Sequence, residues 1–164
     1  MSIHAGRPTR EENLMEMAHV AAERSTCSRA HVGCVFARDG RVLVTGYNGA
    51  PAGMPHCDHH CSCGVTQMSI KRTHDLTCKS SEPCTIAVHA EANAIAFAAK
   101  HGVGLEGSEL FATFSPCVSC AQLLVNVGIT KLHSAAMYRV KEGVDLLVSA
   151  GIQVVDCSNS PVIR

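Results

Sequence analysis

The sequence predicts an α/β fold in three layers, in which a mixed five-stranded sheet lies between helices. Two observations lead to this fold class. Runs rich in β-branched residues flank the dipeptide Asp39-Gly40, which is a strong hairpin signal. After residue 89, helical patterns alternate with short apolar strands, and connections of that length join parallel strands and place helices on both faces of the sheet. The chain, residues 1–164, fits a single domain.

The first predicted element is a helix over residues 9–25. Thr9 and Glu12 form a capping-box pattern at its start, and apolar residues follow at helical spacing. These apolar residues are Leu14, Met17, Ala18, Ala21 and Ala22. The hairpin is predicted next, over residues 31–49.

Residues 50–88 interrupt this regular pattern. The segment lacks sustained periodicity and contains half of the cysteines and several histidines, so we expect a long insertion that a metal holds in place. Beyond it, a helix begins after residue 89 and ends near Gly102. The remaining predictions are strands at 109–114, 131–138 and 152–157 and helices at 117–128 and 144–151.

The composition argues against membrane and nucleic-acid roles. Lys and Arg together number 14, as do Asp and Glu, and no long basic run occurs, so a broad nucleic-acid surface is not expected. No apolar stretch is long enough to cross a membrane, and the N-terminal residues do not resemble a secretion signal. We therefore expect a cytoplasmic protein, in which cysteines serve metal binding or catalysis rather than disulfides.

A candidate catalytic centre is formed by "HAE" at 89–91 and "PCVSC" at 116–120. Each motif begins a predicted helix, and the two helix N-termini can meet at one end of the sheet. His89, Cys117 and Cys120 would supply three zinc ligands and leave the fourth tetrahedral position to water. Glu91 would take up the proton of that water and deliver it. The plainer alternatives are a glutamate favoured by the helix dipole and a closed structural zinc.

The combination H-x-E followed by P-C-x-x-C is the signature of zinc-dependent nucleobase deaminases. Together with "RSTCSRAHVG", "GYNGAPAG", "HAEANAI" and "SPCVSCA", it resembles the deoxycytidylate (dCMP) deaminase family, especially its regulated phage and bacterial members. Nucleoside deaminases usually have Cys at the position of His89. The long, ligand-rich connection between Asn48 and His89 also resembles the dCMP deaminases, since that of tRNA adenosine deaminases is much shorter.

The resemblance implies a cytidine-deaminase-like fold and the hydrolysis of dCMP to dUMP and ammonia at the catalytic zinc, which would supply dUMP for dTMP synthesis. Water would attack C4 of the pyrimidine, while Glu91 would protonate N3 and then the departing amine. The residues implied in substrate binding are Asn48, Arg29, Ser115, Pro116 and Tyr138. From turn chemistry alone, Asn48 would be a structural turn residue.

The resemblance also implies a structural zinc. Cys27, Cys57 and Cys84 match metal-binding positions of related dCMP deaminases, and Cys61 is the favoured fourth ligand. Cys63, Cys78 and several histidines remain alternatives for that fourth position, and a further zinc in the insertion stays open. The plain alternative is that these cysteines are ordinary buried or surface thiols.

Regulation is a further implication of the resemblance. Family members with such an insertion are typically homohexamers, and dCTP activates and dTTP inhibits them, each bound with Mg²⁺. A phage-encoded member would act in the host cytoplasm. The loop implied in effector binding contains Gly46, Tyr47, Asn48, Gly49, Ala50 and Gly53. The same residues would also serve a simple strand exit.

Two other functions remain as alternatives. A nucleic-acid or free-base deaminase would use the same zinc site, but nucleic-acid binding calls for a basic groove and stacking aromatics, and this chain has no Trp, four Phe and two Tyr. A non-catalytic zinc-binding module would leave Glu91 without a role. Replacing Glu91 by Gln separates these functions, since turnover should vanish in an enzyme and binding should survive in a module.

Overall fold

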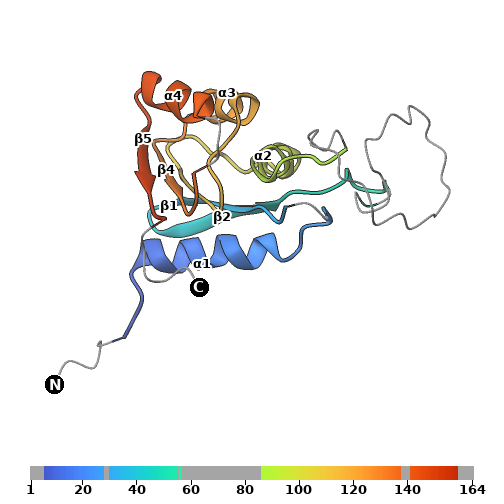
Figure 1. The fold of residues 1–164 in the computed structure, drawn as a ribbon, viewed down its shortest axis with the longest axis horizontal. Helices are drawn as coiled ribbons and strands as arrows, with labels where there is room; N and C mark the ends of the chain where they lie inside the picture. The colour runs from blue at the N-terminus through green and yellow to red at the C-terminus, as the bar shows by residue number, and fades with distance from the viewer. Residues whose placement is uncertain (1–5, 28–29, 55, 57–85, 138–140, 159–164) are drawn as a thin grey trace.

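The computed structural model describes residues 6–27, 30–54, 56, 86–137 and 141–158 (Figure 1). Within these ranges, the helices are α1 (Arg10–Ala22), α2 (Ala90–His101), α3 (Val118–Asn126) and α4 (Glu142–Ser149). The strands are β1 (Gly33–Arg38), β2 (Arg41–Tyr47), β3 (Glu109–Ala112), β4 (Lys131–Ser134) and β5 (Gln153–Asp156). Among the described residues, no helix combines the length and the apolar character needed to cross a membrane.

The strands form one mixed sheet in the order β2-β1-β3-β4-β5. β1 pairs antiparallel with both β2 and β3, whereas β3, β4 and β5 run parallel. The hairpin therefore occupies one edge and the parallel strands lie beyond it. Both the mixed sheet and its five strands confirm the fold class predicted from the sequence.

Helices cover both faces of this sheet, as Figure 1 shows, with α1 on one side and α2, α3 and α4 on the other. Alternation along β1 explains the two layers of core. Cys34 and Phe36 pack with residues of α2, α3 and α4, while Val35 and Ala37 pack with residues of α1. Because successive strand residues point to opposite faces, the buried residues of β1 contribute to both cores.

The hairpin turn has the conformation that its two residues favour. Asp39 has φ 54° and Gly40 has φ 73°, so both central residues are in the left-handed region. A two-residue turn with two positive φ angles matches the right-handed twist of the strands on either side. This turn pairs Arg38 with Arg41 and sets the register of β1 and β2.

Helix α1 begins with the predicted capping box. Thr9 Oγ1 accepts a hydrogen bond from Glu12 N at 3.1 Å, and Glu12 Oε2 accepts one from Thr9 N at 2.7 Å. The buried face differs from the apolar positions selected in the sequence, since Met15 is 6% exposed and Met17 is 40% exposed. The close approach of α1 to Gly33 of β1 decides this rotation, because a Cβ at Gly33 would overlap the Ala18 carbonyl oxygen.

Strands β3, β4 and β5 are shorter than predicted, ending at Ala112, Ser134 and Asp156. After β3, the chain leaves the ladder, and Ser115 N donates to Ala136 O at 2.9 Å. After β4, Ser134 Oγ donates to Ala136 O at 2.8 Å and closes a tight turn. Both strands end early because the chain turns there toward the start of the next helix.

Candidate catalytic metal centre

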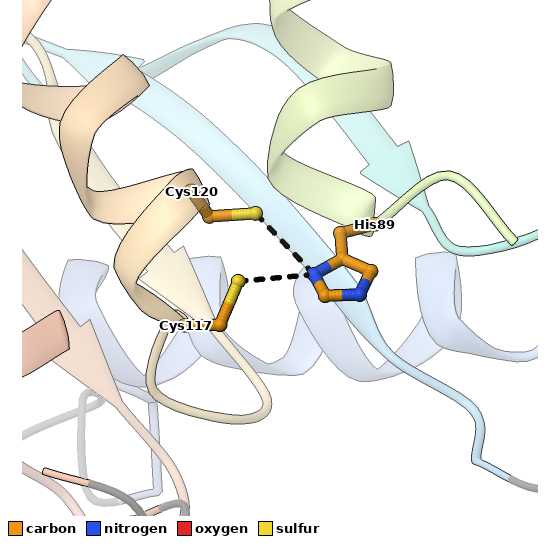
Figure 2. Close-up of side chains that lie close together, drawn as sticks. All are labelled: His89, Cys117 and Cys120. Carbon is orange, nitrogen blue, oxygen red and sulfur yellow. Dashed lines mark hydrogen bonds between the residues drawn. The ribbon is translucent and has the colours of Figure 1, made fainter. Parts of the chain in front are cut away.

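Two helix N-termini meet beside the sheet, each with a candidate metal ligand at its N-cap. His89 precedes α2 with φ −68° and ψ 154°, and Cys117 precedes α3 with φ −71° and ψ 169°. Neither side chain forms a hydrogen bond that caps its own helix. Figure 2 shows that they point toward each other instead, with Cys120 on the first turn of α3 completing the cluster.

The three side chains have the separations expected of ligands to one metal ion. His89 Nδ1 lies 3.4 Å from Cys117 Sγ and 3.4 Å from Cys120 Sγ. All three donor atoms lie within 4.8 Å of one another. Zinc–nitrogen and zinc–sulfur bonds at tetrahedral angles place such atoms about 3.5 Å apart. One imidazole and two thiolates therefore fit a zinc ion, with one coordination position left for a further ligand.

The thiols of Cys117 and Cys120 change each other's pKa. Hydrogen bonds from Cys120 and His89 lower the pKa of Cys117 to about 3. The hydrogen bond to Cys117, together with burial and the nearby charge of Glu91, raises the pKa of Cys120. Metal binding would release the protons that these sulfurs still hold, because zinc binds thiolates.

Glu91 lies in the first turn of α2, and its side chain is only 4% exposed. Burial raises the pKa of its carboxyl group, while a hydrogen bond from its own backbone N–H, the nearby charge of His89 and a hydrogen bond with Cys120 oppose the increase. The carboxyl is therefore next to the metal cluster and is more readily protonated than a carboxyl in water. This is the setting that general acid and base catalysis requires.

Glycines allow β2 to approach the start of α2 and α4 to approach the loop before α3. A Cβ at Gly46 of β2 would overlap the carbonyl oxygen of Ala90, the first residue of α2. A Cβ at Gly143 of α4 would overlap the carbonyl oxygen of Pro116. Both contacts hold backbone next to a metal-ligand candidate, so glycine at these positions helps to place the site.

Asn48 follows β2 and lies beside this centre. Gly49 and Val88 form an isolated antiparallel bridge, with N–O distances of 3.1 and 2.8 Å, which brings Asn48 opposite His89. Asn93, four residues after His89, donates from Nδ2 to Tyr47 O at 2.9 Å. The sequence analysis missed Asn93, although its i+4 spacing from His89 places it on the same helix face.

The other predicted site residues that the structure describes lie on the segments around the candidate metal site. Ser115 and Pro116 are buried immediately before Cys117. Tyr47 and Gly46 end β2. Gly49, Ala50 and Gly53 follow β2, and Ala50 N donates to Thr26 Oγ1 at 3.2 Å. The predicted effector loop thus leaves the sheet next to the metal cluster.

Several predictions fall outside the described residues. They concern Arg29 and Tyr138 in substrate binding and Cys57, Cys61 and Cys84 as ligands of a structural zinc. Cys27, the remaining predicted ligand of that zinc, is described and is buried, with 5% of its surface exposed. Its burial is compatible with either a ligand or a packed thiol.

Most of the chain is similar to known deaminases, in agreement with the resemblance found in the sequence. Residues 8–136 match the family model described as the cytidine and deoxycytidylate deaminase zinc-binding region. The chain is 33% identical to the deoxycytidylate deaminase of Enterobacteria phage T2 over 86% of its length and 88% of the phage protein. It is 37% identical to that of Mycobacterium phage D29 over 77% of its length and 94% of that protein.

A solved structure extends the likeness to three dimensions. The dCMP deaminase of the cyanophage S-TIM5, determined in complex with dCMP and dUMP, is similar with a TM-score of 0.72 and 29% identity. The alignment covers 95% of this chain and 98% of the cyanophage protein. Together with the match to the family model, these likenesses show that the chain belongs to the cytidine and deoxycytidylate deaminase family.

Proposed function

We propose that this protein catalyses the zinc-dependent hydrolytic deamination of dCMP to dUMP and ammonia. The observation that carries the proposal is the meeting of His89, Cys117 and Cys120 at two helix N-termini beside the buried carboxyl of Glu91. The likeness to phage dCMP deaminases, including one in complex with dCMP and dUMP, supports this choice of substrate.

The residues of the site divide the reaction between them. When bound by His89, Cys117 and Cys120, zinc would acidify a water molecule for attack at C4 of the pyrimidine. Glu91 would accept one proton of that water and donate it to N3; it would then take the second proton from the oxygen attached to C4 and give it to the amine as the C4–N bond breaks. Its raised pKa suits this shuttle, because the carboxyl must hold and release a proton in turn.

Substrate binding is proposed at the end of β2 and around α3. Asn48, which lies opposite His89, contacts the sugar. Ser115 and Pro116 line the base next to Cys117, Arg29 binds the phosphate, and Tyr138 stacks on the base. These roles extend the resemblance noted in the sequence, and the bridge that places Asn48 opposite His89 supports the role of Asn48.

We further propose a structural zinc and nucleotide regulation. Cys27 would bind that zinc with Cys57, Cys61 and Cys84. In a homohexamer, dCTP and dTTP with Mg²⁺ would bind the loop from Gly46 to Gly53 and act in opposite directions on the supply of dUMP for dTMP synthesis. The distance between effector loop and active site is short, since Gly49 of the loop is bonded to Val88, next to His89.

The test is ammonia release from dCMP, deoxycytidine and dCTP, with zinc content measured per chain. Turnover of dCMP with at least one zinc bound supports the proposed reaction, and opposite responses to dCTP·Mg and dTTP·Mg support the regulation. Zinc binding without turnover of any of the three compounds would contradict the reaction and favour a nucleic-acid or free-base substrate, or a zinc-binding module.

A further inference from the structure

The side-chain amide of Asn48 is held by three hydrogen bonds. Its Oδ1 accepts one from Val32 N at 2.9 Å and one from Ser25 Oγ at 2.7 Å. Its Nδ2 donates one to Ala30 O at 2.8 Å. All three partners belong to the segment that joins α1 to β1, and Asn48 is only 6% exposed. The amide is therefore held in place before any ligand arrives.

These partners permit only one orientation of the amide. A backbone N–H can only donate and a backbone carbonyl can only accept, so oxygen faces Val32 and nitrogen faces Ala30. Val32 and Ser25 occupy both lone pairs of Oδ1. Within the part of the chain that the structure describes, the hydrogen-bonding capacity left to Asn48 is one N–H of Nδ2.

This remaining N–H belongs to a residue at the metal centre. The bridge between Gly49 and Val88 places Asn48 opposite His89, and opposite residues of an antiparallel pair carry their side chains on the same side. A ligand bound next to His89 thus meets, at Asn48, a donor and no acceptor.

We propose that Ser25 is a positioning residue that makes Asn48 a hydrogen-bond donor only and thereby selects an acceptor oxygen on the substrate's sugar. The inference rests on the proposed function, in which Asn48 contacts the sugar of dCMP, whose one hydroxyl is at the 3′ carbon. Ser25 Oγ directs its hydrogen to Asn48 at 2.7 Å in preference to Ala30 O at 3.4 Å, and it accepts from Cys27 N at 3.2 Å.

Ser25 bonds to Asn48 through its side chain, whereas Val32 and Ala30 bond to it through their backbone. A substitution of Ser25 can therefore remove one hydrogen bond and keep the other two. Without the Ser25 hydroxyl, one lone pair of Oδ1 opens to water or to a donor on the ligand, and the amide is less firmly held. Recognition of the sugar should then weaken and become less selective, while the metal cluster and Glu91 stay unchanged.

The first measurement compares three substrates on the zinc-loaded wild-type protein: dCMP, 2′,3′-dideoxy-CMP and 3′-fluoro-2′,3′-dideoxy-CMP. The fluorine can accept a hydrogen bond weakly and cannot donate one. We expect kcat/KM to fall about 3- to 10-fold when the hydroxyl is removed and to recover in part with fluorine, since one neutral hydrogen bond is at stake. Equal kcat/KM for the dideoxy and fluoro compounds would overturn the donor-only assignment.

The second measurement repeats the series with Ser25→Ala, Ser25→Thr and Ser149→Ala. Ser149 is the matched control, since its hydroxyl donates to Asp145 O at 2.7 Å on the exposed end of α4. For Ser25→Ala we expect KM for dCMP to rise about 3- to 10-fold, with kcat and zinc content kept and with less discrimination between dCMP and its dideoxy analogue. Ser25→Thr should restore the discrimination, and Ser149→Ala should match the wild type.

The outcomes separate this inference from the function on which it rests. A zinc-loaded wild type that fails to deaminate dCMP overturns the proposed function, and this inference with it. An active wild type whose discrimination is unchanged in Ser25→Ala overturns the role of Ser25 alone. A Ser25→Ala protein that loses kcat on dCMP and on the dideoxy analogue equally also overturns it, because that pattern shows general structural damage.

Discussion

Two histidines on opposite sides of the sheet show how surroundings decide what this side chain can do. His89 is exposed at the start of α2, and its Nδ1 faces two cysteine sulfurs, each 3.4 Å away. His133 of β4 is 5% exposed, bonds through Nε2 to Glu109 Oε2 at 2.8 Å and stacks on Phe111 with ring centroids 4.2 Å apart. One ring faces the two other residues of a candidate metal site, and the other is enclosed by partners from its own sheet.

A histidine beside acidic or sulfur groups is not by itself a functional site. Around His89, three donors converge on one point and can bind an ion. Around His133, one carboxylate and one aromatic face satisfy the ring and fasten β4 to β3. We therefore expect His89 to control zinc content and turnover, and His133 to control stability.

The largest effect is expected from His89→Ala, which removes one of three ligands. Zinc content should fall by about one ion per chain, and dCMP turnover should be lost, because two thiolates alone leave half of the tetrahedral shell open. His133→Ala is the control and should keep its zinc. Metal analysis after dialysis and an ammonia assay check this, and zinc retention with turnover in His89→Ala would refute the assignment.

The next effect is expected from Glu91→Gln. The amide fills the same space as the carboxyl but cannot shuttle a proton, so kcat should fall about 10²- to 10⁴-fold while zinc stays bound. Steady-state kinetics together with zinc analysis make the measurement. A Glu91→Gln protein with kcat near the wild-type value would show that another group moves the proton.

A stability effect is expected from His133→Ala. The change empties a buried volume against Phe111 and leaves Glu109 without its partner, so the free energy of unfolding should drop by about 2–4 kcal/mol. Urea denaturation measures the change, and kcat of the folded variant should stay within about twofold of the wild type. Loss of kcat with unchanged stability in His133→Ala would contradict the purely structural role of His133.

Gly143→Ala tests the packing that places Cys117. The added methyl would overlap Pro116 O, so the loop before α3 must shift, and we expect a destabilisation of about 1–3 kcal/mol with weaker zinc binding. Gly104→Ala is the matched control, because a Cβ there meets nothing within 4 Å. Competition with a zinc chelator reads out affinity. Equal zinc affinity in the two variants would show that α4 does not position the cysteines.

The smallest effect is expected from Asn93→Ala, which removes the bond from α2 to Tyr47 O. A single hydrogen bond of this kind contributes about 1 kcal/mol, so KM should rise a few-fold with kcat preserved. Asn126→Ala at the exposed end of α3 serves as the control. Identical KM values for the two variants would leave Asn93 without a role at the site.

Much of the candidate catalytic site could be predicted from the sequence, because its residues belong to two short motifs. His89 and Glu91 are two residues apart, and Cys117 and Cys120 are three apart at a helix start, so each pair reaches one place through local geometry alone. The hairpin turn at Asp39-Gly40 and the capping box at Thr9 are local in the same sense, and both form as predicted.

The rest depended on contacts between distant segments. The predicted ends of β3 and β4 lie beyond the observed ends at Ala112 and Ser134. The apolar sequence continues past the point where the hydrogen-bonded ladder stops. The buried face of α1 was misassigned at Met17, since the close contact with Gly33 rotates the helix. Apolar periodicity indicates that a helix has a buried face, but it does not indicate which neighbouring element packs against that face.

The three-layer fold class and the two motifs that contain the candidate zinc ligands could be predicted from the sequence, because strand alternation and the spacing within each motif act over a few residues. The partners that hold the Asn48 amide and enclose His133 became visible in the folded chain alone. Asn48 depends on Val32, 16 residues away, and His133 on Glu109, 24 residues away. Such partners are set by strand register and helix packing, which form only when the whole sheet assembles.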